Sequence, residues 1–297
     1  MTEENITRKI MGTPKSLCFS HMLVVSAMVL GFSFPSWKRP PLASRPPQTQ
    51  MQKQRRDHLM IAETLSQPQS LFDKGVSTTY FRDVCQNNQK NAKSSSFRGN
   101  FNLSEWDQQT KGGLVDNDRI MLAKYYSGAN SVFEWGLGES SYIAGHLNVT
   151  RYSGVDSDAN WVSAARDKCP SHFRLYFADI GKTESWGNPV EKLPKTIYDY
   201  VLSPLHLELC PFDVYMVDGR FRVACALMAL LHASRHDHDA TILMHDYTGK
   251  RKNYLSMERV CDVVEFSGSK LVALKRKPDV TDEAIYEMYL EASRSRH

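Results

Sequence analysis

The feature that most constrains the fold is a regular alternation of short apolar runs and helical patterns from residue 116 onward. Strand patterns lie at residues 131–136, 152–156, 173–179, 212–219 and 240–246, and helical patterns at residues 116–128, 140–147, 159–169, 221–234 and 253–261. Apolar strands that alternate with helices are typical of a parallel sheet covered on both faces. We therefore predict an α/β fold with a doubly wound, mostly parallel sheet.

Two further strand patterns, at residues 262–268 and 270–277, close the series. The short link between them predicts an antiparallel hairpin at the edge of the sheet, which makes a seven-stranded, Rossmann-like sheet in total. In open parallel sheets, ligands bind at the carboxyl ends of the strands, near the point where the strand order reverses. Polar residues at the strand ends are therefore the candidate functional residues.

The composition limits the class of protein. An apolar fraction of 41% over 297 residues supplies a large core and excludes a wholly disordered chain. The net charge is only +4, and no Lys/Arg block is interleaved with aromatic residues, so we expect no nucleic-acid partner. The six cysteines are far apart and form no CxxC pair. They indicate neither a zinc knuckle nor a disulfide-dense scaffold, and they leave one or two disulfides open.

The N-terminus carries a separate signal. Residues 16–37 contain no Lys, Arg, Asp or Glu, and a membrane-spanning helix needs about 20 such residues. We interpret this segment as a single-pass transmembrane signal-anchor after a tail at residues 1–15. A cleaved signal peptide and an organelle presequence stay open, and the flanking charges do not settle the orientation.

The anchor defines the expected domain order and compartment. Residues 38–63, rich in Pro and Gln, predict an extended stem, residues 64–115 an N-terminal extension, and residues 116–297 the α/β domain. This layout predicts a membrane protein of the Golgi or the endoplasmic reticulum with a lumenal body. In that compartment the tripeptides that begin at Asn102 and Asn148 could accept glycans.

Residues 132–147 place two glycines between the first strand and its helix. Gly136 and Gly138 let the backbone approach a ligand closely, and the N–H groups of the helix start can face polar or anionic groups. The third glycine of the dinucleotide fingerprint is missing, and Glu139 would repel a pyrophosphate, so a cofactor without phosphates fits better.

Acidic residues end the next two strands. Asp156 follows the glycine turn by about twenty residues, the spacing at which a carboxylate can accept both hydroxyls of a ribose. Asp179 ends the third strand, from which its side chain could reach the rim of a nucleobase. The alternative for Asp179 is a helix cap or a turn.

The fourth and fifth strands end in Asp218 and Asp246, which should converge because these strands would be adjacent. The pair could hold a divalent cation, or one carboxylate could act as a general base, with His245 as an alternative base. Arg220 and Arg222 could grip a carboxylate or a sugar acid. The structural alternatives are a turn cap for Asp218 and salt bridges between Asp246 and either arginine.

Two other features favour structural roles. The run HASRHDHD at residues 232–239 falls at the opposite edge of the sheet from the predicted site and is interpreted as a solvated turn rather than a metal site. Cys225 lies inside an apolar helix and is interpreted as a core residue.

The segments VFEWGLGESSYIA, GVDSDANWVSAA, FADI and FDVYMVDGR, in this order, resemble class I S-adenosylmethionine-dependent methyltransferases over residues 116–277. The resemblance implies that Gly136 and Gly138 hold the methionine part of the cofactor, that Asp156 holds the ribose and that Asp179 approaches the adenine. Glu134 matches the acid that commonly begins the glycine motif. The sequence departs from the commonest pattern at Leu137 and Glu139, which replace small residues.

Shorter segments are similar to narrower groups. SWGNPVEK, VDGRFRVACAL and ILMHDY resemble methyltransferase-like proteins known mainly from sequence, and VDG is more distantly similar to membrane-anchored glucuronoxylan O-methyltransferases. The resemblance implies methyl transfer from S-adenosylmethionine to oxygen or nitrogen of a small molecule or glycan.

Two alternatives stay open. The D-x-D motif at residues 155–158 is typical of membrane-anchored glycosyltransferases, although the helical pattern directly after it favours the methyltransferase. The other alternative is a catalytically inactive methyltransferase-like binding module.

Overall fold

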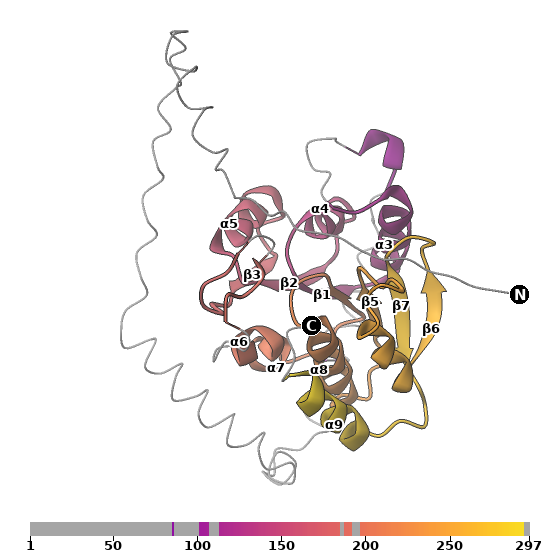
Figure 1. Cartoon of the computed structure of the whole chain (residues 1–297). Helices are drawn as coiled ribbons and strands as arrows, with labels where there is room; N and C mark the ends of the chain where they lie inside the picture. Colours follow the sequence, from indigo (N-terminus) through magenta and orange to yellow (C-terminus); the bar gives the residue numbers. More distant parts are fainter. Residues whose placement is uncertain (1–84, 86–100, 107–112, 185–186, 192–196, 294–297) are drawn as a thin grey trace, which may run out of the picture. The chain divides into compact units, whose positions relative to one another are not determined.

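The computed structural model describes residues 85, 101–106, 113–184, 187–191 and 197–293 (Figure 1). By its internal contacts the chain divides into Met1–Lys74 and Gly75–His297, and every described residue belongs to the second unit. The predicted signal-anchor, the stem and most of the N-terminal extension lie outside the described residues. Among the residues that are described, no helix is both long enough and apolar enough to cross a membrane.

The predicted seven-stranded mixed sheet is confirmed. Its strands are β1 (Ser131–Trp135), β2 (Arg151–Asp156), β3 (Arg174–Phe177), β4 (Val214–Val217), β5 (Thr241–Met244), β6 (Cys261–Phe266) and β7 (Val272–Arg276), in the order β3-β2-β1-β4-β5-β7-β6. The first five strands are parallel, and β7 runs antiparallel to both β5 and β6. Every residue of β1, β4 and β5 is buried, which explains why these strands are continuous apolar runs.

The longer helices pack in two layers. Figure 1 shows α3 (Asp116–Gly128), α4 (Glu139–His146) and α5 (Ala159–Lys168) on one face of the sheet. The other face carries α8 (Arg222–Ser234) and α9 (Asp282–Ala292), with the short helices α6 (Ile197–Val201) and α7 (Ser203–Leu207). Because the chain leaves β1 toward β2 and returns to β4 on the other side, the strand order reverses between β1 and β4.

Several elements differ from the sequence prediction. The helix predicted at residues 253–261 is the 3-10 helix η4 (Tyr254–Arg259), and the connection after the third strand contains α6 and α7. Helix α9 was not predicted, although Thr281 caps it and Ile285, Met288 and Tyr289 form a buried stripe at helical spacing. A second 3-10 helix, η2 (Leu103–Glu105), lies in the extension ahead of α3.

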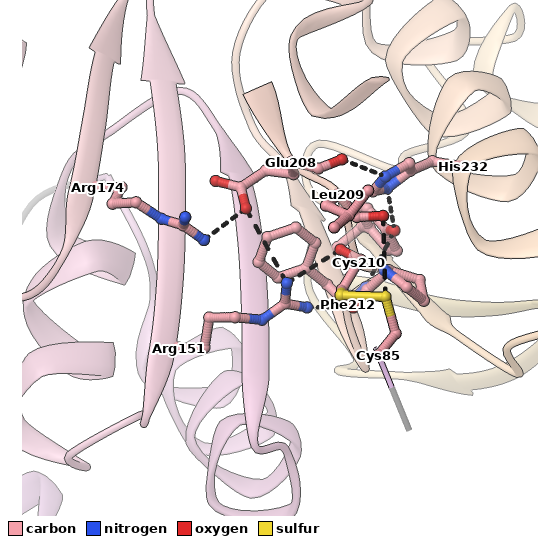
Figure 2. Close-up of a disulfide and its surroundings, with 10 residues drawn as sticks. Cys85, Arg151, Arg174, Glu208, Leu209, Cys210, Phe212 and His232 are labelled. Carbon is pink, nitrogen blue, oxygen red and sulfur yellow. Dashed lines mark hydrogen bonds and ion pairs between the residues drawn. A yellow bond between two sulfur atoms is a disulfide. The ribbon is translucent and has the colours of Figure 1, made fainter. Parts of the chain in front are cut away.

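A disulfide joins Cys85 to Cys210, 125 residues away (Figure 2). Cys210 precedes β4 and therefore lies at the amino edge of the parallel strands. Arg151, at the start of β2, donates from Nη1 to the Cys210 carbonyl at 3.0 Å and covers the Phe212 ring at 3.8 Å. The buried Glu208 carboxylate accepts a hydrogen bond of 2.5 Å from Arg174, so charged contacts fix the segment ahead of β4.

The three free cysteines of the described chain and His232 have structural surroundings. Cys169, Cys225 and Cys261 are buried free thiols, which confirms the core assignment of Cys225. His232 is fully buried and lies 2.7 Å from the Tyr215 hydroxyl, so the first residue of the HASRHDHD run belongs to the core.

Candidate functional site

A cavity of about 940 Å³ opens at the carboxyl ends of the parallel strands, where the strand order reverses between β1 and β4. Pockets that hold small ligands have volumes of roughly 300–1,000 Å³. The predicted site residues that line the cavity are Gly136, Gly138, Asp156, Asp218, Arg220, Arg222, His245 and Asp246. Glu134 and Asp179 are not among the lining residues.

The two glycines of the turn after β1 are needed for different reasons. Gly136 has a φ of +91°, and a Cβ there would lie 2.6 Å from the backbone nitrogen of Gly219, which follows β4. The absence of a side chain at Gly136 therefore allows the ends of β1 and β4 to lie this close together. Gly138 has extended backbone with a φ of 172°, and a Cβ there would project into open space. The turn itself does not require a glycine at residue 138. The absence of a side chain there instead leaves space for a ligand at the wall of the cavity.

Asp156 lies directly beside the glycine turn. Its carboxylate accepts hydrogen bonds of 2.8 Å from the backbone N–H of Leu137 and from that of Asp158. Burial raises the pKa of Asp156 to about 6, although the backbone hydrogen bonds act in the opposite direction. The carboxylate is therefore mainly ionised at neutral pH, and it can accept further hydrogen bonds from a ligand.

Glu134 lies behind the turn and is fully buried. It forms hydrogen bonds with Ser140, Ser141 and Tyr152, which join β1 to the start of α4 and to β2. Burial raises the pKa of Glu134 to about 8, so the carboxyl group is mainly protonated at neutral pH. Through these hydrogen bonds, Glu134 stabilises the glycine turn from its buried side.

Asp179 is exposed at the end of β3, and its carboxylate accepts a hydrogen bond of 2.9 Å from the backbone of Gly181. This is the geometry of an aspartate turn. The end of the cavity beyond β2 is lined instead by Ser157, Asp158 and the half-exposed Trp161.

Asp218, His245 and Asp246 gather at the ends of β4 and β5. Their ligand atoms all lie within 4.8 Å of one another, which is close enough for a shared metal ion. However, the buried guanidinium of Arg222 lies 3.1 Å from Asp218 and 3.1 Å from Asp246. Its fixed positive charge already bridges the two carboxylates, so the donor set fits an arginine better than a divalent cation.

Arg222 also donates hydrogen bonds to the carbonyls of Gly219 and His245, at 3.0 Å and 2.6 Å. The salt-bridge alternative for Arg222 and Asp246 is therefore the one that the structure shows. Arg220 instead reaches across the cavity wall, where it donates to the Asn188 side chain at 2.7 Å.

His245 stands between two carboxylates. Its Nδ1 lies 3.0 Å from Asp218 and its Nε2 lies 3.4 Å from Asp118. Burial by itself would lower the pKa of His245, but these hydrogen bonds outweigh burial and raise it to about 9. The imidazole is therefore charged at neutral pH, where it donates hydrogen bonds rather than accepting a proton.

The pKa of Asp218 is lowered. Burial would raise it, but the charges of Arg222 and His245 together with the hydrogen bond from His245 outweigh burial. Asp218 is therefore held ionised at the cavity, next to the end of the glycine turn.

Sequence reasoning missed Asp118, which is fully buried on α3. Besides its contact with His245, Asp118 accepts hydrogen bonds from the Ser267 hydroxyl at 2.6 Å and from the backbone of Leu271 at 3.1 Å. An aspartate in the first turn of a helix is ordinarily interpreted as favourable to the helix dipole. Its distant partners have no signal in the local sequence.

Sequence reasoning also missed the partners of Glu139. The Glu139 carboxylate accepts hydrogen bonds from Arg119 at 2.6 Å and from the Trp106 indole at 3.0 Å, and all three side chains are buried. Arg119 neutralises the acid that departs from the commonest methyltransferase pattern. These contacts attach the end of the extension to the glycine turn.

The backbone is strained beside the cavity. Phe221 and Asp246, which follow β4 and β5, have φ angles of 54° and 59°, in the left-handed region that non-glycine residues seldom adopt. Such conformations cluster at functional sites, where the surrounding structure holds them.

No family model and no curated protein matches this chain. Among solved structures, a methyltransferase-like protein from Silicibacter pomeroyi is 25% identical, covers 63% of this chain and 98% of its own length, and has a TM-score of 0.53. A TehB-like SAM-dependent methyltransferase from Corynebacterium glutamicum is 14% identical and covers 67% of this chain and 98% of its own length, at a TM-score of 0.32.

The similarity to the Silicibacter protein extends over nearly the whole of that chain. The second similarity has too low a TM-score to support any argument about this protein. Together with the strand order and the cavity, the first similarity identifies the fold as α/β and methyltransferase-like.

Proposed function

We propose that this protein is an S-adenosylmethionine-dependent methyltransferase that acts on oxygen or nitrogen of a small molecule or glycan. The observation that carries the proposal is that Leu137 of the glycine turn and Asp156 meet through a 2.8 Å hydrogen bond and line one cavity at the switch point of the sheet. The methyltransferase-like fold supports the same conclusion.

The residues have separate roles in this proposal. Asp156 accepts the ribose hydroxyls, and the open side of Gly138 leaves room for the methionine part of the cofactor. S-adenosylmethionine supplies an electron-poor methyl group, so the protein mainly aligns the acceptor. Asp218, ionised and at the cavity surface, orients the acceptor through a hydrogen bond. Arg222 and the charged His245 hold Asp218 in place.

Cofactor binding tests the proposal. We expect Asp156→Asn to lower the affinity for S-adenosylhomocysteine at least tenfold, measured by calorimetry on the full chain, because the neutral amide is a poorer acceptor for the ribose hydroxyls. Asp179→Asn is the matched control, since Asp179 lies outside the cavity, and it should leave the affinity unchanged. Equal affinity of the wild type and the Asp156 variant would refute the assignment.

The contacts of the D-x-D motif disfavour the glycosyltransferase alternative. Asp156 accepts hydrogen bonds from two backbone groups, and Asp158 caps α5 by accepting a hydrogen bond of 2.8 Å from Asn160. Asp158 therefore serves the start of α5, and this helix follows the motif directly, whereas the D-x-D motif of a glycosyltransferase would lie in a loop. Binding of S-adenosylhomocysteine without any methyl transfer would instead favour the inactive binding module.

We also propose that the body lies in the lumen of the endoplasmic reticulum or Golgi, behind the membrane anchor predicted at residues 16–37. The support is the disulfide between Cys85 and Cys210, because disulfides persist in oxidising compartments. Protease protection of the body in intact microsomes, with mass spectrometry of the Cys85–Cys210 peptide, tests this placement.

A further inference from the structure

The two N-x-S/T tripeptides of the described chain have different structural explanations. In the first, both polar residues have a local role. The Asn102 side chain accepts hydrogen bonds from the backbone of Ser104 at 3.1 Å and from its hydroxyl at 2.8 Å, and so caps η2. The capping contact accounts for both Asn102 and Ser104 without any modification.

In the second tripeptide, the structure explains the asparagine, Asn148, but not the threonine, Thr150. Asn148 follows α4 with a φ of 57°, a left-handed position that asparagine tolerates better than most residues. That conformation explains an asparagine at residue 148 but requires nothing of residue 150. Thr150 is exposed, and within the described residues neither its hydroxyl nor the Asn148 amide forms a hydrogen bond with another side chain.

The position of Asn148 in the fold also allows a large group. Asn148 is exposed and precedes β2, so it lies at the amino edge of the parallel strands. The disulfide lies at the same edge, where Arg151 of β2 contacts the Cys210 carbonyl (Figure 2). The cavity opens at the opposite, carboxyl edge. A glycan on Asn148 would therefore leave the cavity uncovered.

We propose that Asn148 carries an N-linked glycan, an inference that rests on the lumenal placement proposed above. Modification of this kind needs an exposed N-x-S/T asparagine in a chain that enters the secretory pathway. The reaction joins Asn148 Nδ2 to the anomeric carbon of an oligosaccharide. The amide loses one proton, and the lipid-linked diphosphate of the oligosaccharide donor leaves.

The test is expression of the full chain in insect or mammalian cells, with removal of N-glycans by peptide N-glycosidase in ¹⁸O-labelled water. We expect conversion of Asn148 to labelled Asp and a downward shift of the band on a gel. Thr150→Val should abolish the shift and Thr150→Ser should retain it, while Asn148 stays in place to hold its left-handed backbone. Asn102→Gln is the matched control and should leave the Asn148 glycan unchanged.

Three outcomes would overturn the proposal. An unmodified Asn148 in chains that contain the Cys85–Cys210 disulfide would show that the site is not used although the compartment is right. An unmodified Asn148 together with free Cys85 and Cys210 thiols would refute the lumenal placement as well. A glycan on Asn102 but not on Asn148 would show that the wrong tripeptide was assigned as the modified site. Binding of S-adenosylhomocysteine is independent of all three results.

Discussion

At the scale of single residues, two neighbouring carboxyl groups differ in charge because they differ in access to solvent and in partners. Glu134 is fully enclosed, and burial raises its pKa to about 8. Asp156 lines the cavity and keeps backbone donors, so its pKa reaches only about 6. Near neutral pH, a protonated acid supports the glycine turn and an ionised acid faces the ligand.

The protonated state of Glu134 predicts a pH dependence of stability. Because the pKa rises from 4.5 to about 8 on folding, the contribution of Glu134 to the free energy of unfolding is complete below pH 4.5 and is lost as the pH rises to about 8. Glu134→Gln cannot ionise and lacks this loss. We expect the wild type to lose stability relative to the Gln variant across this range in urea unfolding. Parallel pH profiles of the two proteins would contradict the prediction.

The ionised state of Asp156 predicts a pH dependence of binding in the opposite sense. Acceptance of the ribose hydroxyls favours the carboxylate, so affinity for S-adenosylhomocysteine should fall by up to about tenfold for each pH unit below about 6. Calorimetric titrations at a series of pH values measure this slope. The Asp156→Asn protein provides the reference, since its weak affinity should not change over the same range.

At the scale of elements, the turn between β1 and α4 is fixed by contacts from other parts of the fold. Gly219 after β4 packs against Gly136, and Glu139 is bound by Arg119 of α3 and by Trp106. The turn is thus held from the sheet side and from the helix side. A preorganised backbone of this kind loses little entropy when a ligand binds.

The two glycines of the turn should respond differently to alanine. Gly136→Ala should lower the free energy of unfolding by about 1–3 kcal/mol, because its φ is positive and the added Cβ would collide with Gly219. Gly138→Ala should change stability by less than about 0.5 kcal/mol, since its backbone is extended and its Cβ meets open space.

Ligand affinity separates the two variants further. The Cβ of Gly138→Ala projects into the cavity, so affinity for S-adenosylhomocysteine should fall at least tenfold in a protein of normal stability. Urea unfolding and calorimetry on both variants measure the two effects. A stable Gly138→Ala protein with unchanged affinity would show that the cofactor does not approach this wall.

At the scale of the whole molecule, the disulfide closes the first part of the α/β domain, up to the segment ahead of β4, into one loop. Cys85 and Cys210 are 125 residues apart, and β1, β2 and β3 lie between them. A crosslink over so long a loop restricts the unfolded chain strongly. The bond also holds Cys85 at the amino edge of the parallel strands, which is the edge away from the cavity.

Removal of the disulfide should therefore destabilise the protein by about 2–5 kcal/mol. We expect the Cys85→Ser, Cys210→Ser double variant to unfold at lower temperature than the wild type. Reductant should bring the wild type to the same value and leave the double variant unchanged. If reductant lowered the unfolding temperature of both proteins equally, the loss of stability would not be due to reduction of the Cys85–Cys210 disulfide.

The parts of the fold that were predicted from sequence have local signals. The strands β1 to β5, the edge hairpin and the pairing of the glycine turn with Asp156 follow from periodicity and from spacing within one βαβ unit. The errors at η4 and α9 concern short or terminal elements, whose type depends on what they pack against. The third strand was predicted to end at Asp179, but β3 ends at Phe177, and the Asp179 carboxylate accepts a hydrogen bond from the backbone of Gly181.

The amino-acid sequence by itself determined the order of strands and helices. The reason is that the spacing of apolar residues within a short segment shows whether that segment buries one face as a strand or as a helix. Only the tertiary structure decided that Arg222 occupies the gap between Asp218 and Asp246, that Asp118 holds His245 from 127 residues away, and that Cys85 pairs with Cys210. These contacts join residues from separate elements. Their geometry exists only once the sheet has brought the strand ends together.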